Sequence, residues 1–229
     1  MKLPIISYST TRFKEQWDLE LIDLIVQAAM QAMDKITINS SSIDAVYLAN
    51  NFNILNKSGN LNALVAEKLG INKVNLISGA DIAGAAAIQR AAESINSGEN
   101  SVVLVIGSEK MSDFMSSDLM EINMATLASE ESSNGVTPAA LFAMIAKAHM
   151  KEFGTTSDTL ASISAKSHSY AKLNPIAQYP FEVTKEQVLA SPELSDPIRT
   201  LESCTNPDGA AALILTNQEL AAKYTKKTV

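Results

Sequence analysis

The apolar run from Val102 to Ile106 is the strongest constraint on how this chain folds, because it contains no polar alternation. A strand with one face in solvent alternates apolar and polar residues, whereas a strand covered on both faces is apolar throughout. Strands of the second kind occur in mostly parallel sheets that carry helices on both sides. This run therefore predicts an α/β domain with a buried central strand.

Strand and helix patterns alternate ahead of this run, which is typical of βαβ units. The predicted strands lie at residues 4–8, 45–49 and 74–77, and the predicted helices lie at residues 18–33, 60–69 and 83–95. We expect Asp18 to cap the first of these helices and Gly70 to close the second.

The alternation stops after Gly107. Residues 111–205 are rich in Ser, Met and Ala, and they predict helices that open at Pro138, Ser157 and Thr184. A strand pattern resumes at residues 208–216. We therefore expect an α/β domain formed by residues 1–110 and 206–229, with a helical insertion at residues 111–205.

Charge and cysteine content exclude several classes of function. The net charge is −7, which argues against nucleic-acid binding because phosphate contacts need clustered Lys and Arg. The single cysteine, Cys204, can form neither an internal disulfide nor a cysteine-rich zinc site, and we expect no metal. Since no apolar run is long enough to cross a bilayer and no signal peptide is evident, we expect a cytoplasmic protein without membrane association.

Residues 74–87 combine an apolar strand, a Ser-Gly turn and the start of a helix of small residues. This is the strand, sharp turn and helix N-terminus at which many α/β enzymes place a nucleophile. The residue at the tip of the turn is Asp81, rather than Ser or Cys.

Several segments occur in the order and at the spacing of one known family. The strand that ends in Gly107-Ser108-Glu109-Lys110-Met111 is followed by residues 149–156, 174–179, 196–199 and 208–212. Together they resemble the thiolase superfamily, in particular its sterol-carrier-type and archaeal acetoacetyl-CoA thiolases. The resemblance implies a thiolase-like half, with a mixed five-stranded sheet, helices on both faces and a helical loop domain inserted as a lid.

The sequence departs from the family pattern at two places. The family's nucleophilic cysteine falls on Asp81, and the family's second half, which supplies a His and a second Cys, has no counterpart here. The resemblance therefore implies a protein related to acyl-CoA C-acyltransferases that is not an active thiolase alone. We expect a subunit whose partner supplies the C-terminal half; the alternatives are a non-catalytic scaffold or regulatory subunit, and a truncated product.

Asp81 has three interpretations. We favour a carboxylate that caps the following helix at a site that has lost its thiol. The second is a general base or electrostatic group in altered CoA chemistry. The third, an acyl-aspartyl nucleophile, is the least favoured because a mixed anhydride is high in energy.

Four further residues are candidates for chemistry that also have plainer structural explanations. His168 lies in the predicted insertion, where the resemblance implies contacts to coenzyme A, although a packed or surface histidine is the commoner situation. For His149 we expect packing, and for Cys204 a buried structural role. Lys110 follows the strongest strand, where α/β sheets collect ligands, but we expect it to be solvated or ion-paired.

The small-residue helix at residues 83–95 bears on assembly. In the family, the two halves pack through a shared central layer of helices, to which this helix corresponds. Exposing such an apolar layer is costly for a monomer. We therefore expect a homo-oligomer, or a heteromer with a second thiolase-half subunit, and an acyl-CoA thioester as the possible ligand.

Overall fold

The computed structural model describes residues 3–52, 59–79, 82–125 and 127–225. Contacts divide the chain into two compact units, which we describe separately. The sheet unit comprises Met1–Asp113 and Pro207–Val229, and the helical unit comprises Phe114–Asn206. Among the described residues, no helix has the length and apolarity that a membrane span requires.

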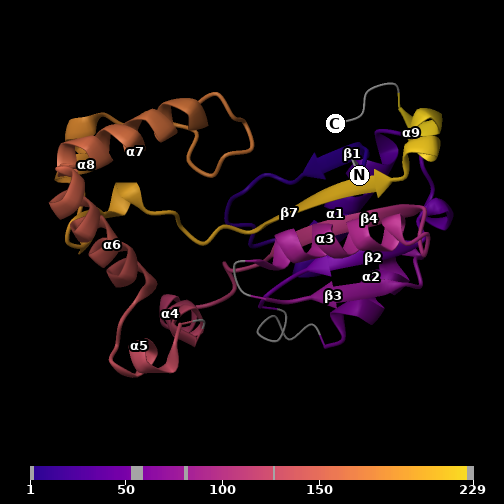
Figure 1. Ribbon diagram of the computed structural model, residues 1–229, viewed down its shortest axis with the longest axis horizontal. Helices are drawn as coiled ribbons and strands as arrows, with labels where there is room; N and C mark the ends of the chain where they lie inside the picture. Colours follow the sequence, from indigo (N-terminus) through magenta and orange to yellow (C-terminus); the bar gives the residue numbers. More distant parts are fainter. Residues whose placement is uncertain (1–2, 53–58, 80–81, 126, 226–229) are drawn as a thin grey trace. The chain divides into compact units, whose positions relative to one another are not determined.

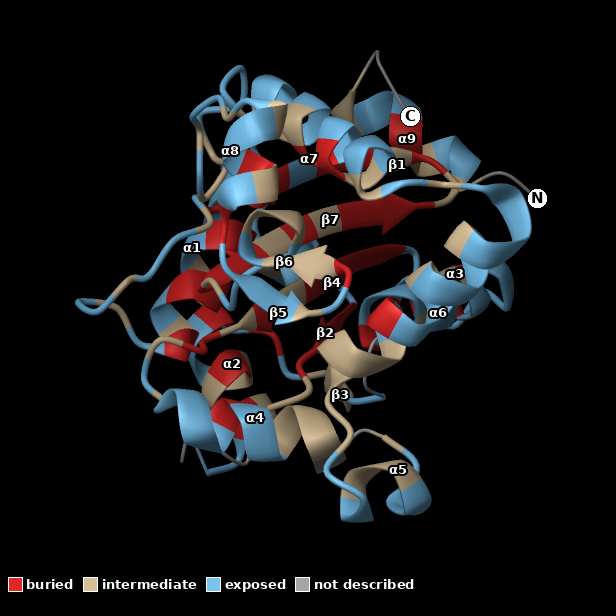
Figure 2. Ribbon diagram, turned by 90° about the vertical axis from the view of Figure 1, so that its left-hand side faces the viewer, coloured by how far each residue is buried: buried red, intermediate tan, exposed pale blue. Residues whose placement is uncertain are grey.

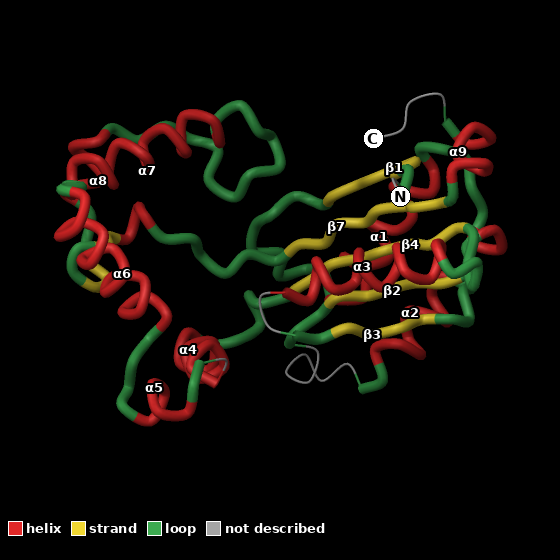
Figure 3. Tube along the Cα trace, in the orientation of Figure 1, coloured by secondary structure: helices red, strands yellow, loops and turns green. Residues whose placement is uncertain are grey.

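The sheet unit is built on a mixed five-stranded sheet, which confirms the predicted α/β class (Figures 1 and 3). In spatial order its strands are β1 (Ile5–Thr10), β7 (Gly209–Thr216), β4 (Val102–Glu109), β2 (Ala45–Ala49) and β3 (Val74–Ile77). Strands β4, β2 and β3 are parallel, while β7 runs antiparallel to both β1 and β4. The first five residues of β4 are buried, as its unbroken apolar run predicts.

Helices cover both faces of this sheet. One face packs against α1 (Leu21–Asp34), α2 (Leu61–Leu69) and α9 (Gln218–Tyr224), whose buried residues join one hydrophobic core. The opposite face carries α3 (Ala83–Asn96), and among the described helices only α3 contributes to that second core (Figures 1 and 2). A short 3-10 helix, Ser40–Ser42, precedes β2.

The helix ends agree with the sequence at α2 and differ at α1. Asn60 caps α2, and Gly70 closes it in the left-handed conformation that glycine adopts without steric cost. Asp18 was wrongly predicted to cap α1, which begins after Glu20. The reason is local: Leu19 donates its N–H to the Gln16 carbonyl in a turn, and the Asp23 carboxylate accepts from the Glu20 N–H at 3.0 Å.

The three helices predicted for the insertion are present as α6 (Pro138–Phe153), α7 (Ser157–Ala171) and α8 (Lys185–Ala190). The helical unit also contains α4 (Ser116–Ala125), α5 (Ser129–Ser133) and the 3-10 helix Thr200–Glu202, which were not predicted individually. The hydroxyls of Thr137, Thr156 and Thr184 cap α6, α7 and α8. A small hairpin of β5 (Glu193–Ser195) and β6 (Ile198–Arg199) was not predicted, because its residues are exposed or half-buried and carry no strand pattern.

Candidate functional site

Three parallel strands end at one edge of the sheet. In register, Ala49 at the end of β2 lies beside Ile77 of β3 and Gly107 of β4. Residues that follow these positions therefore meet at this edge, where α/β proteins commonly bind ligands. The helix α3 also starts from here.

Asp81, the predicted tip of the turn, lies outside the described residues, so its role stays a prediction. The residues on either side are described. Ile82 donates its N–H to the Gly79 carbonyl at 3.2 Å, and α3 begins at Ala83. The strand, turn and helix order of the sequence is thus present around the predicted nucleophile position.

Glu109, the last residue of β4, is a half-buried ionisable group at this edge. Its Oε1 accepts the Asn51 backbone N–H at 2.6 Å, and its Oε2 accepts from the Asn50 side-chain amide at 3.1 Å. The Asn50 amide also donates to the Ser108 carbonyl at 2.7 Å. The carboxylate therefore holds the start of the segment that follows β2.

Burial raises the pKa of Glu109 from 4.5 to about 7, although backbone N–H groups of Asn51 and Phe52 oppose this shift. Desolvation disfavours the charged form, while N–H donors favour it. Here desolvation prevails. Glu109 therefore changes charge near neutral pH, which is the range in which acid–base groups of enzymes operate.

The raised pKa predicts that Glu109 makes folding pH-dependent. Between about pH 4.5 and 7 the folded state holds a proton that the unfolded state has released, so stability decreases as pH rises through this range. In Glu109→Gln this contribution is absent. We expect urea denaturation to show the variant gaining stability relative to wild type from pH 5 to pH 8. Glu67→Gln, at an exposed position of α2, should track wild type throughout.

Lys110 points into a second cluster, formed around Asp208. Its ammonium lies 3.3 Å from Asp208 and 2.8 Å from Asp113, and its side chain is 1% exposed. The expected ion pair is confirmed, but the pair is buried rather than solvated. Asp208 also accepts backbone N–H bonds from Gln16, Met111 and Ser112, together with the Ser112 hydroxyl.

The Asp208 cluster has a structural role in the sheet unit. Burial pulls the pKa of Asp208 upward, but the Ser112 hydroxyl and the backbone donors outweigh it and hold this pKa below its usual value. The cluster ties together the end of β4, the start of β7 and the segment before α1. It therefore fixes both points at which the chain leaves and re-enters the sheet unit.

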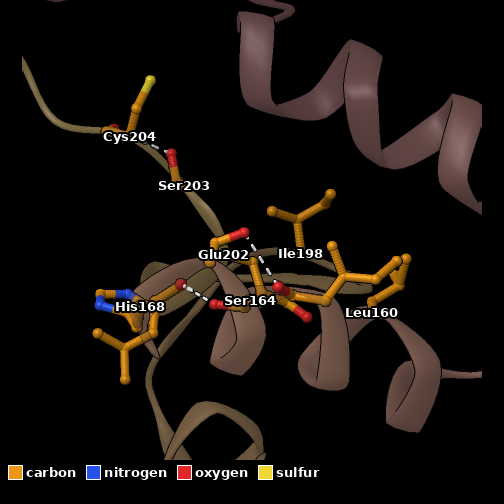
Figure 4. Close-up of a pocket in the computed structure, with 10 residues that line it drawn as sticks. Leu160, Ser164, His168, Ile198, Glu202, Ser203 and Cys204 are labelled. Atoms are coloured by element: carbon orange, nitrogen blue, oxygen red, sulfur yellow. Dashed lines mark hydrogen bonds between the residues drawn. The ribbon is translucent and has the colours of Figure 1, made fainter. Parts of the chain in front are cut away.

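His168 lines a cavity of about 370 Å³ within the helical unit (Figure 4). The lining residues are Leu160, Ile163, Ser164, Ser167, His168, Ile198, Leu201, Glu202, Ser203 and Cys204. The imidazole stacks on Phe181 at 5.7 Å between ring centroids. Its Nδ1 is buried and has no hydrogen-bond partner among the described residues.

Of the other predicted residues, Cys204 lines the same cavity as His168, whereas His149 lies outside it. His149 is exposed, and it contacts the Phe153 ring and the Thr155 hydroxyl at the end of α6 rather than packing in a core. Cys204 was wrongly predicted to be buried: it is exposed, because residues 203–206 form an exposed irregular segment. Figure 4 shows its thiol directed away from the other labelled residues. In the described part of the chain, no cluster of metal-ligating side chains is present.

Glu109, Asn50, Asn51 and Asp208 were not singled out from the sequence. Glu109 and Asp208 stand in segments that carry the family resemblance, but no chemical role was assigned to either side chain, and Asn50 and Asn51 stand in no such segment. Their position could have identified them, because all four lie at the ends of strands, where α/β sheets commonly bind ligands.

Comparisons with known proteins agree with this architecture. Residues 2–219 match the family described as "Thiolase, N-terminal domain". The chain is 34% identical to the acetyl-CoA acetyltransferase of Methanothermobacter thermautotrophicus over 228 residues, which is 98% of this chain and 59% of the relative. It therefore spans less than two thirds of the length of that relative.

Solved structures share the fold at low sequence identity. The Ltp2-ChsH2(DUF35) aldolase superposes with a TM-score of 0.79 at 20% identity, covering 99% of this chain and 58% of that one. Human mitochondrial 3-ketoacyl-CoA thiolase in complex with CoA superposes with a TM-score of 0.75 at 19% identity, covering 96% and 66%. This chain belongs to the thiolase family, in which it corresponds to the N-terminal domain.

Proposed function

We propose that this chain forms the N-terminal half of a thiolase-like acyl-CoA site, and that the other half comes from outside these 229 residues. The observation that carries the proposal is the edge at which β2, β3 and β4 end and α3 begins. There the family's nucleophile position, occupied by Asp81, follows a turn whose backbone is held by neighbouring strand ends.

The proposal includes that the chain alone does not catalyse acyl transfer by the thiolase route. That route needs a thiolate to accept the acyl group, a base to form the carbanion and donors for the oxyanions. Asp81 replaces the thiol, and a carboxylate is a poor substitute because its acyl product is a high-energy anhydride. We propose that Asp81 caps α3, where a negative charge is favoured by the helix N-terminus.

The uncovered side of α3 supports association with a second half. Gly84 and Ala85 are exposed, Ile88 is 42% exposed and Ala92 is half-buried, which places a stripe of small and apolar residues along one side. These positions recur at helical spacing and therefore share a face. We propose that a second thiolase half, from another copy or from a different chain, covers this stripe.

The helical unit supports a role in coenzyme A binding. We propose that residues 111–205 act as a lid and that His168 contacts the ligand from the cavity described above. The cavity volume falls in the range of small-molecule sites, and an imidazole among its lining residues can hydrogen-bond a phosphate or an amide. The solved human thiolase is described as a complex with CoA, which agrees with this ligand class.

Replacing His168 by alanine should weaken CoA binding by about tenfold, the value of one hydrogen bond to a charged group. Isothermal titration of the purified protein with CoA measures this directly. His149→Ala is the matched control, because that exposed histidine lies outside the cavity and should bind CoA as wild type does. Equal affinities for the His168 variant and wild type would remove His168 from the site, and no binding by wild type would overturn the CoA proposal.

A second candidate is a non-catalytic scaffold or regulatory subunit, favoured by the aspartate at the nucleophile position. The two candidates differ in one assay on the intact assembly. Acyl transfer that disappears in Asp81→Ala would exclude the scaffold, while an assembly that binds CoA without acyl transfer would support it.

A further inference from the structure

One hydrogen-bond path joins the ends of three strands in the sheet unit. It starts at the Glu109 carboxylate at the end of β4, which accepts the Asn51 backbone N–H at 2.6 Å beyond β2. It continues through the Asn51 side chain, whose Oδ1 accepts the Gly79 N–H at 3.0 Å beyond β3. Glu109 and Gly79 are thus linked by a single intervening residue, although they belong to different strands.

Both backbone polar groups of Gly79 are hydrogen-bonded. Its N–H is bound by Asn51, and its carbonyl accepts the Ile82 N–H at 3.2 Å, immediately ahead of α3. The Asn50 N–H is fixed in turn by the Ile77 carbonyl at 3.1 Å. A change in the bond between Glu109 and Asn51 therefore acts on the backbone from which α3 starts.

We propose that Glu109 is a positioning residue that sets the backbone at Gly79 through Asn51, so that its protonation is transmitted to Gly79, two residues ahead of the family's nucleophile position in the sequence. The inference rests on the proposed function only in treating the nucleophile position as part of an acyl-CoA site. The coupling itself concerns Glu109, Asn51 and Gly79.

Ionisation of Glu109 changes the strength of the first bond in the path. A carboxylate accepts charge-assisted hydrogen bonds that are about twice as strong as neutral ones, so the Asn51 segment is held more tightly when the proton is lost. The pKa of about 7 places this change near neutral pH.

Among the described residues, no charged group contacts the Glu109 carboxyl group. Asn50, Asn51 and Phe52 meet it from the segment after β2, and Gly209 lies opposite it on β7. Lys110, the next residue, turns its ammonium to Asp208 and Asp113 instead. Asp81 follows Gly79 by two residues in the sequence and is controlled for by Asp81→Asn.

Nuclear magnetic resonance of the full chain tests this coupling without an activity assay. The Glu109 carboxyl carbon reports its titration, and the Gly79 amide reports the far end of the path. We expect both signals to move with the same midpoint, near pH 7, and we expect the midpoint of Gly79 to persist in Asp81→Asn. A Gly79 amide that stays constant while Glu109 titrates would overturn the proposal.

Variants at Asn51 separate transmission from simple structural support. Asn51→Leu removes the acceptor for Gly79, so Glu109 should still titrate while the Gly79 shift is lost. Glu109→Gln should abolish the neutral-pH shift of Gly79, and Glu67→Gln should leave it unchanged. If Asn51→Leu retains the full Gly79 shift, the path is wrong.

The same variants in the complete assembly distinguish failure of this inference from failure of the proposed function. If acyl transfer or CoA binding follows the Gly79 midpoint in wild type and loses that dependence in Asn51→Leu, both hold. If the Gly79 coupling is observed and no CoA binds, the proposed function fails and the positioning role stands.

Discussion

Replacing Asp208 by alanine should destabilise the sheet unit by about 3–5 kcal/mol, the loss expected when one partner of a buried ion pair is removed. Asp208 is fully buried, and its carboxylate receives the Lys110 ammonium, three backbone N–H groups and one hydroxyl. Alanine leaves these donors without an acceptor. The free energy of unfolding of a domain is about 5–15 kcal/mol, so this single substitution should remove a large share of the stability.

Urea denaturation followed by Trp17 fluorescence measures the effect, since this single tryptophan lies 5.9 Å from the Lys110 ammonium. Glu99→Ala is the control, because it breaks an exposed pair with Lys73 and should cost about 0–1 kcal/mol. The double variant Lys110→Met with Asp208→Leu should recover part of the loss by removing both charges. Similar losses for Asp208→Ala and Glu99→Ala would show that the cluster is not a structural clamp.

Ile88→Arg on α3 should abolish or strongly weaken assembly, by about 30-fold or more, while leaving the fold intact. Ile88 is 42% exposed and sits in the middle of the apolar stripe. A charge buried without a partner at an interface costs about 2–5 kcal/mol. Sedimentation velocity over a concentration series measures the association, and circular dichroism shows whether the fold persists.

Met30→Arg provides the matched control for this experiment. Met30 is 44% exposed and lies on α1, which covers the opposite face of the same sheet. If the second half covers α3, the Met30 variant assembles as wild type does and the Ile88 variant does not. Equal behaviour of the two variants would contradict the proposed interface.

The sequence predicted those features that depend on local pattern. The unbroken apolar residues of β4 fit only a strand that is covered on both faces. Gly70, Pro138 and Thr184 mark helix ends by their own backbone or capping chemistry. The α1 start was misplaced because two acidic residues compete there, and only the reciprocal contact with Asp23 selects Glu20 over Asp18.

The site was less predictable because its contacts join distant parts of the chain. Glu109 and Asn51 are 58 residues apart, and Lys110 and Asp208 are 98 residues apart. Their partners depend on strand order and register, which no local pattern supplies. The prediction that Cys204 is buried was wrong for a different reason. Cysteine as a residue type favours burial, but the segment that carries Cys204 lies at the surface.

Native mass spectrometry of the protein purified from its source, with and without CoA, tests the central proposal most directly. The account predicts an assembly in which this 24.5 kDa segment is joined by a second thiolase half, as a partner or as continuing chain, and which gains the mass of CoA when the ligand is added. A 24.5 kDa monomer that takes up no CoA would contradict it.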